Sequence, residues 1–171
     1  MTLEQRIERL EAIEAIKQLK ARYFHACDTK QPDRVRDCFA EGDINLVYGR
    51  IGSFGHRDEL VAVFRKLACH EHIVEMHHGQ NPQVRIIDVN TAEATFGLFY
   101  HLIDTRQQTV TQLGGFYEDG FTRENGEWKI CSSHYEVVST QIFDLTEGLA
   151  KPVFAGGVAP VELDDPGKQA E

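Results

Sequence analysis

The chain has 171 residues, of which 42% are hydrophobic, a size that fits one globular domain burying roughly 70% of the surface its unfolded chain exposes. With 18 Lys and Arg against 27 Asp and Glu, the net charge is -9, and no basic run follows a phosphate backbone or an anionic lipid surface. The composition therefore argues against nucleic acid and against a membrane as partners.

The four cysteines are scattered, form no Cys-x-x-Cys pair, and lie in apolar segments, where a free thiol behaves as a small hydrophobe. The N-terminus has no apolar signal region, and no stretch approaches the roughly 20 residues needed to cross a bilayer. We therefore expect reduced cysteines and a cytoplasmic protein.

The first part of the chain is expected to be mainly helical. Apolar residues recur every three or four positions from Leu3 to Cys27, which is typical of an amphipathic helix, with Thr2 as its N-cap. A break around Pro32 precedes a short helix capped by Asp33. The expected elements are helices over 3–27, 33–39 and 57–69, with a strand over 44–48 between the last two.

From Ile73 onward the pattern favours β-structure. The expected strands cover 84–89, 92–103, 109–121 and 128–139, with turns at 90–91 and 125–126. Gly114 and Gly115 predict a bulge or sharp bend, by which a sheet curls around a cavity. Helices followed by a long curled sheet predict an α+β domain, in which four to six strands bend around the first helix.

We expect one domain over residues 1–147 and an irregular tail over 148–171. The tail carries four glycines and three prolines, a composition that disfavours a regular element. Phe154 and Val158 are suited to folding over a pocket mouth or a neighbouring subunit, and residues 163–171 are expected to be disordered.

The chemistry is expected to centre on Asp28 and His77. Asp28 follows the first helix at the negative end of its macrodipole, where a carboxylate is costly unless a cationic or hydrogen-bonding group meets it. A histidine oriented by a carboxylate is the minimal apparatus for removing a proton near neutral pH. His78 is the alternative base, because adjacent residues of an extended chain face opposite sides. In the purely structural alternative, Asp28 only closes a turn and His77 bonds to loop carbonyls.

The strand expected over 92–103 alternates an apolar face with a more polar one. The apolar face is the expected pocket wall. Tyr100 on this face is then a candidate hydroxyl donor, and His101 points outward. The opposite assignment, in which the more polar face lines the pocket, stays open. Other tyrosines suit either ligand contact or the core, since their one polar end needs a partner. The candidate ligand contacts are Phe96, Leu98 and Tyr100, together with Tyr23, Tyr48 and Tyr117.

Four histidines and two glutamates fall close together, so a metal site has to be considered. They are His70, Glu71, His72, Glu75, His77 and His78. A metal-binding His-x-His pair would lie on a strand after a glycine, whereas His70 directly follows a helix and no glycine precedes it. We therefore expect no metal and no cofactor.

Four features carry a resemblance to a known family: the element order, the Asp after the first helix, the His-x-x-x-Asn run and the closing Asn-Gly-x-Trp-Lys-Ile hairpin. Through them the chain resembles the SnoaL-like branch of the nuclear transport factor 2-like superfamily over about residues 5–143. Segments 28–31, 77–81 and 126–130 look closest to hexachlorocyclohexane dehydrochlorinase; bile-acid 7α-dehydratase and scytalone dehydratase are similar at a greater distance. The resemblance implies a cone-shaped α+β barrel, with a strongly curved, mostly antiparallel sheet around the N-terminal helices.

For function, the resemblance implies cofactor-free elimination by an Asp/His dyad, which falls on Asp28 and His77. Tyr23 matches a tyrosine that lies five residues before the Asp in bile-acid dehydratase, so it is the third expected catalytic residue, which would polarise a carbonyl or protonate a leaving hydroxyl. The dehydratase-like relatives are trimers or dimers, so the resemblance also implies a homo-oligomer, with a trimer favoured and a dimer as the alternative.

One departure concerns the last strand, where several relatives carry an arginine and this chain has Ser132, Ser133 and His134. Serine stabilises a departing anion or an enolate far less well than arginine does. The departure favours a neutral or ketone-like substrate, with Ser133 as a ligand contact.

These features predict a cofactor-independent lyase of the dehydratase type, or a related isomerase, acting on a hydrophobic cyclic or aromatic small molecule. The alternative is a non-catalytic protein: a small-molecule-binding protein, or a structural subunit like the small subunit of aromatic-ring dioxygenases. In that case the two dyad residues would bond only to the scaffold, and the outer face of the sheet would carry a large apolar interface.

Overall fold

The computed structural model describes residues 1–148, 150–156, 159–165 and 167. Its helical elements are α1 (Leu3–Asp28), α2 (Pro32–Asp37), the 3-10 turn η1 (Gly49–Ile51) and α3 (Arg57–Leu67). Its strands are β1 (Asn45–Val47), β2 (Ser53–Phe54), β3 (Ile73–Ile86), β4 (Thr91–Asp104), β5 (Thr109–Glu124), β6 (Glu127–Asp144) and β7 (Lys151–Gly156). None of the described helices is long and apolar enough to span a membrane.

The first helix begins at a capping box. The side chain of Thr2 accepts a hydrogen bond from the backbone of Gln5, and the side chain of Gln5 accepts one from the backbone of Thr2. The predicted N-cap is therefore confirmed. The expected cap of α2 was wrong: Gln31 is the N-cap, and Pro32 takes the first helical position, where no N–H is needed.

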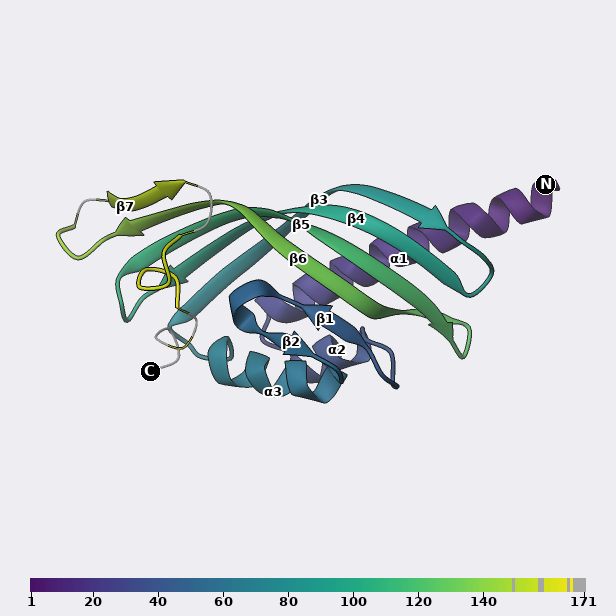
Figure 1. The fold of residues 1–171 in the computed structure, drawn as a ribbon, viewed down its shortest axis with the longest axis horizontal. Coiled ribbons are helices and arrows are strands. Elements are labelled where there is room, and N and C mark those ends of the chain that lie inside the picture. Colours follow the sequence, from purple (N-terminus) through teal and green to yellow (C-terminus); the bar gives the residue numbers. More distant parts are fainter. Residues whose placement is uncertain (149, 157–158, 166, 168–171) are drawn as a thin grey trace.

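The strands form one sheet in the order β2-β1-β6-β5-β4-β3, with β7 paired to β6. The pairs are antiparallel except that of β1 with β6. In Figure 1 the long strands β3 to β6 arch over α1, with α2 and α3 below. The predicted α+β class is confirmed, and the sheet is curved but not closed. It contains seven strands instead of four to six.

A register irregularity between Gly114 and Gly115 lies at the predicted bulge. A Cβ at Gly115 would lie 2.3 Å from the carbonyl oxygen of Glu136. The backbone of β6 passes so close that only glycine fits, and the irregularity contributes to the bend of the sheet.

The tail is more regular than its composition suggested. Lys151–Gly156 pairs with the end of β6, with Phe154 opposite Ile142. Pro152 is tolerated because β7 is an edge strand. Further on, the N–H groups of Leu163 and Asp164 donate to the carbonyl of Pro160, which makes a turn. Val158 and residues 168–171, which also belonged to the prediction for the tail, lie outside the described residues.

The core lies between the concave face of the sheet and the helices. Ile16 of α1, Leu46 of β1 and Ile130 of β6 are completely buried there, as is Phe39. On β4 the side chains that point into the core are those of the predicted apolar face: Ala94, Phe96, Leu98 and Tyr100.

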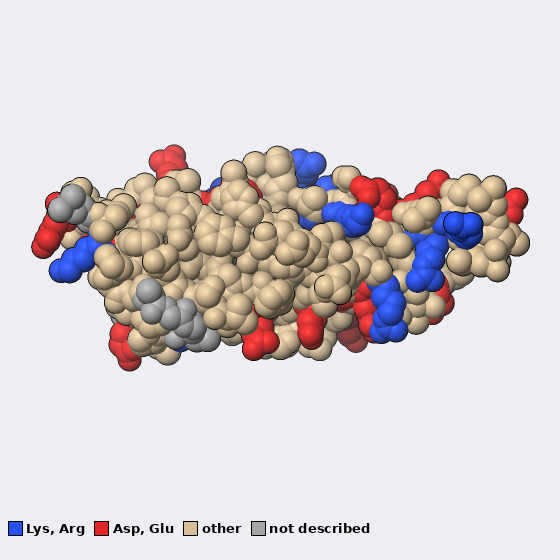
Figure 2. All heavy atoms as spheres, turned by 90° about the horizontal axis from the view of Figure 1, so that it is seen from above, with Lys and Arg blue, Asp and Glu red and all other residues tan. Residues whose placement is uncertain are grey.

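The opposite, convex face of the sheet is unusually apolar. Figure 2, which views Figure 1 from above, shows that charged side chains gather mainly towards the two ends of this face, with a wide uncharged area between them. We call its exposed apolar residues the outer patch: Val74, Met76, Phe99, Phe116 and Val138.

Candidate active site

The structure brings Asp28, the last residue of α1, against His77 in the middle of β3. The Nδ1 atom of His77 lies 2.6 Å from Oδ1 of Asp28, and the backbone N–H of His77 donates to both carboxylate oxygens at 3.1 Å. The two side chains are only 12% and 14% exposed. Because the carboxylate accepts the Nδ1 proton, Nε2 of the neutral ring is left as the proton acceptor.

Two aromatic rings hold the imidazole in place. Phe24 stacks on His77 with ring centroids 5.4 Å apart and planes 12° apart, and Tyr100 approaches it at 4.7 Å. Gly79 makes room for the first of these rings, since a Cβ there would lie 2.5 Å from a carbon of Phe24. The orientation of the base therefore depends on α1, β3 and β4 together.

Glu75 is a second buried carboxylate beside the dyad. It lies two residues before His77 on the same face of β3, its side chain is 6% exposed, and it pairs with the ammonium of Lys30. The hydroxyl of Tyr100 donates to Glu75 at 2.6 Å. Burial, reinforced by the Glu75 charge, raises the pKa of Tyr100 well above its usual range. The Tyr100 proton is thus committed to Glu75, so this hydroxyl is not the donor to a ligand that the sequence predicted.

His77 lines a cavity of about 180 Å³ beneath the sheet. All five tyrosines of the chain line it as well: Tyr23, Tyr48, Tyr100, Tyr117 and Tyr135. Five of the predicted ligand contacts line this cavity: Leu98 and the tyrosines other than Tyr135.

Three predicted contacts lie elsewhere. His78 is exposed on the other face of β3, beside Phe99, because neighbouring strand residues alternate. Phe96 is buried, and the Nζ atom of Lys20 lies 5.6 Å from the centroid of its ring. Phe96 does not line the cavity. Ser133 is also outside the lining, because it is buried and its hydroxyl donates to Asp119 at 2.6 Å.

The hydroxyl group of Tyr48 is buried in the wall of the cavity. The side chain is buried, and its oxygen has no hydrogen-bond partner among the described residues. Burial, and next the charge of Asp119, raises the pKa of Tyr48 above its usual range. A protonated, unpartnered hydroxyl in a cavity wall is suited to donate to an oxygen atom of a bound molecule.

A buried ion pair supports the end of the cavity where Tyr48 and Tyr117 lie. The ammonium of Lys20 is 2.8 Å from Oδ2 of Asp119 and lies 3.5 Å from the centroid of the Tyr117 ring. Burial lowers the pKa of Lys20, and Asp119 opposes that shift. Ser133, on the part of the last strand where several relatives carry an arginine, is bonded to Asp119 of this pair.

The sequence reasoning missed several groups that line the cavity: Cys27, Glu75, Tyr135 and Asp164. Glu75 could have been found from the two-residue period of β3, which puts it on the same face as His77. Tyr135 could have been found in the same way from Ser133 on β6. No local signal indicates Asp164, because it belongs to no regular element.

The clustered histidines separate in space. His70 stacks on His72 at 5.3 Å and bonds to the carbonyl of Lys66, whereas His77 and His78 face opposite sides of β3. Within the described part of the chain, no three His, Cys, Asp or Glu side chains gather as a metal site would require.

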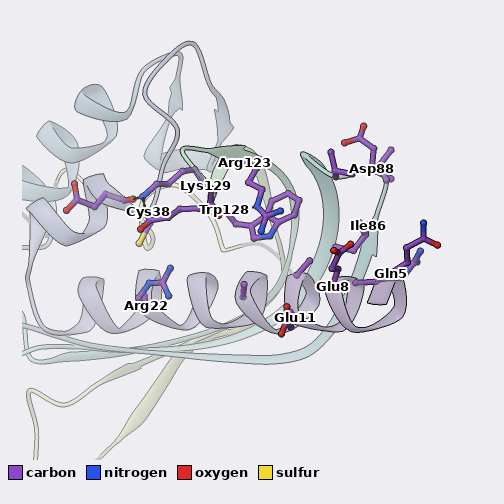
Figure 3. Close-up of a pocket in the computed structure, with 18 of the residues that line it drawn as sticks. Gln5, Glu8, Glu11, Arg22, Cys38, Ile86, Asp88, Arg123, Trp128 and Lys129 are labelled. Atoms are coloured by element: carbon purple, nitrogen blue, oxygen red, sulfur yellow. Dashed lines mark hydrogen bonds and ion pairs between the residues drawn. The ribbon is translucent and has the colours of Figure 1, made fainter. Parts of the chain in front are cut away.

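A larger groove of about 1180 Å³ lies between the first half of α1 and the ends of the β3-β4 and β5-β6 hairpins. Figure 3 shows Glu8 and Glu11 of the helix on one side of it and Arg123 and Trp128 on the other. Its lining mixes acidic and basic residues and includes neither member of the dyad. We therefore assign the candidate active site to the smaller, more apolar cavity.

Comparison with known proteins agrees with this architecture. Residues 8–134 match the SnoaL-like domain. A scytalone dehydratase-like protein of Novosphingobium aromaticivorans is 19% identical, with a TM-score of 0.73 over 90% of this chain and 98% of that one. The hexachlorocyclohexane dehydrochlorinase of Novosphingobium barchaimii is 15% identical, with a TM-score of 0.66 over 90% of this chain and 98% of that one.

An aromatic ring hydroxylase-like protein of N. aromaticivorans is 17% identical, with a TM-score of 0.69 over 95% of this chain and 98% of that one. At such identities these likenesses show the fold alone, and different chemistry is carried on it.

Proposed function

We propose that this chain, which belongs to the family of SnoaL-like domain proteins, is a cofactor-independent lyase of the dehydratase type or a mechanistically related isomerase. One observation carries the proposal: His77, bonded to Asp28 through Nδ1, lines an apolar cavity whose wall also holds the unpartnered hydroxyl of Tyr48. A base and a hydrogen-bond donor in the wall of one mainly apolar cavity are the two groups that removal of a proton next to a carbonyl requires.

In the proposed reaction, Nε2 of His77 takes the proton from a carbon beside a carbonyl. Asp28 keeps the ring in the correct tautomer and stabilises the imidazolium, and Tyr48 donates to the oxygen on which negative charge develops. In elimination, the electron pair forms a carbon–carbon double bond, and the hydroxyl group on the next carbon leaves as water with a proton returned from His77. In isomerisation, the same proton returns to a different carbon. General-base catalysis of this kind supplies roughly 10²- to 10⁴-fold in rate.

The size of the cavity supports a one-ring substrate. An engineered protein cavity of roughly 150 Å³ holds benzene, and drug-sized ligands occupy roughly 300–1,000 Å³. At about 180 Å³ this cavity fits one ring with small substituents. No Lys or Arg is found among the described residues that line it, which favours a neutral molecule over an anion.

The proposal is tested with a panel of one-ring β-hydroxy ketones. Binding is measured by calorimetry, and dehydration is followed by the ultraviolet absorption of the conjugated enone. We expect the wild type to dehydrate at least one ketone. The His77→Gln variant should lose turnover but keep binding, and the Asp28→Asn variant should lose most of its turnover. Ketones that bind but are never converted would contradict the proposal and favour the non-catalytic ligand-binding protein.

A further inference from the structure

Arg50 attaches the C-terminal segment to the body of the protein. Its Nη1 donates to the carbonyl of Asp164 at 3.1 Å and to that of Pro160 at 3.5 Å, and its Nη2 donates to the carbonyl of Ala159. Ala159 is 1% exposed, so the segment packs closely at this point. Because a planar guanidinium has several donors in fixed directions, one arginine can fix the segment in place.

This attachment places the side chain of Asp164 in the wall of the cavity that also contains His77. Its Oδ2 pairs with Nη1 of Arg50 at 3.1 Å. Its Oδ1 makes no hydrogen bond with the part of the chain that the structure describes, and the side chain is 20% exposed. One oxygen is thus held by the protein, and the other is available as an acceptor.

Asp164 and His77 line the same cavity from different parts of the chain. Tyr135 of β6 lines it as well, and the charge of Asp164 is, after burial, the next cause that raises the pKa of Tyr135 to about 12. His77 is on β3, and the strand order separates β3 from β6 by two strands. Because His77 and Asp164 line one cavity of about 180 Å³, a single substituted ring that meets His77 on one side can meet Asp164 on another.

We infer that Asp164 is a specificity-determining residue, whose carboxylate accepts a hydrogen bond from a hydroxyl or amino group at the end of the substrate remote from His77. Arg50 is the positioning residue that holds it there. The substrate class is a neutral one-ring molecule with its reactive carbon at one end and a hydrogen-bond donor at the other. As a statement about reaction this rests on the proposed function, but the binding preference stands apart from it.

The physical basis is the cost of leaving a charged acceptor unpaired when a ligand displaces its water. A ligand with a donor replaces the water that Oδ1 loses when the cavity fills, whereas an apolar analogue of the same shape does not. A site built around such a contact discriminates strongly against the analogue that lacks it.

The test uses two isosteric probes, 4-(hydroxymethyl)acetophenone and 4-ethylacetophenone, which differ by a hydroxyl in place of a methyl group and carry no other hydrogen-bond donor. Their affinities are measured by titration calorimetry. We expect the wild type to bind the hydroxymethyl compound about tenfold more tightly, as for a hydrogen bond to a charged group. We expect Asp164→Ala and Arg50→Met to bind the two probes about equally, and the matched control Asp165→Ala to keep the wild-type preference.

Equal binding of the two probes by the wild type, or an unchanged preference in Asp164→Ala, would overturn the inference. The same titration on His77→Gln should keep the preference, since that variant changes only the base. Failure of proton transfer and failure of this inference therefore show in different experiments.

Discussion

Lys20 and Asp119 form an ion pair 2.8 Å long in which neither side chain is more than 1% exposed. Removing one partner of such a pair leaves a buried, uncompensated charge, which costs about 3–5 kcal/mol. The pair joins α1 to β5 behind Tyr117 of the cavity wall, so its effect should show first in global stability.

We expect Lys20→Met to lower the free energy of unfolding by about that amount and the double variant Lys20→Met/Asp119→Asn to recover part of the loss. Urea unfolding monitored by circular dichroism measures both. The matched control is Lys17→Met, one turn earlier, whose pair with Glu14 is exposed and should contribute little. If the Lys20→Met and Lys17→Met variants were equally stable, the pair would have no such role.

The tyrosines predict a particular response to alkali. Burial is the leading cause that raises the pKa of each of the five, to about 12 for Tyr135. In the unfolded chain a tyrosine titrates near 10. Between these values the folded state binds more protons, so this contribution to stability is complete below about pH 10 and is lost as pH rises through the folded pKa values.

We therefore expect the ultraviolet absorption of phenolate to rise in step with the loss of circular dichroism as pH increases above 10. A phenolate signal equal to one or more tyrosines near pH 10, with the folded spectrum intact, would show that the cavity is open to water.

The close approach at Gly115 predicts a local requirement for glycine. In Gly115→Ala the added methyl group would meet the backbone of Glu136, and β5 and β6 would have to separate. We expect a loss of about 1–3 kcal/mol, as for overpacking of a core. Thermal unfolding measures it, with Gly42→Ala as the control, since nothing lies within 4 Å of a Cβ there. Equal stability of the two variants would remove the packing argument.

The outer patch predicts self-association. Phe99 and Phe116 lie on neighbouring strands of the convex face and are 41% and 55% exposed, which is unusual for aromatic residues of a monomer. We propose a homo-oligomer formed through this face, with a trimer favoured over a dimer. Light scattering at micromolar concentration should show the oligomer for the wild type and a smaller species for Phe116→Glu. Val89→Glu, on an exposed turn, should leave it unchanged; a monomeric wild type would refute the proposal.

How much could be predicted from the sequence depended on whether a signal was local. The 3.6-residue period of α1 and the two-residue period of β4 identify both elements, and they identify the buried face for β4 and for the second half of α1. Leu3, Ile7 and Leu10 belong to the same apolar stripe of α1 but are exposed. The contact between Asp28 and His77 followed from a weaker argument, the need of a carboxylate at a helix end for a partner. That need indicates that a partner exists but cannot by itself distinguish His77 from His78.

The features that were missed depend on distant partners. Lys20 occupies a position that an amphipathic pattern assigns to the surface, and its burial makes sense only with Asp119, far along the chain on β5. The strand β7 owes its order to the free edge of β6, so its own composition gave no indication of it. Asp164 reaches the cavity only because Arg50 holds the segment that carries it.

The central claim is that His77 removes a proton from a carbon atom of a bound substrate. The most direct measurement is hydrogen–deuterium exchange at the carbon beside the carbonyl of one-ring ketones in D₂O, followed by nuclear magnetic resonance, because it needs no leaving group. We predict that the wild type accelerates exchange, that His77→Gln reduces it by roughly 10²- to 10⁴-fold, and that the neighbouring control His78→Gln retains it. Exchange that persists in His77→Gln, or that is absent for every ketone the wild type binds, would contradict the claim.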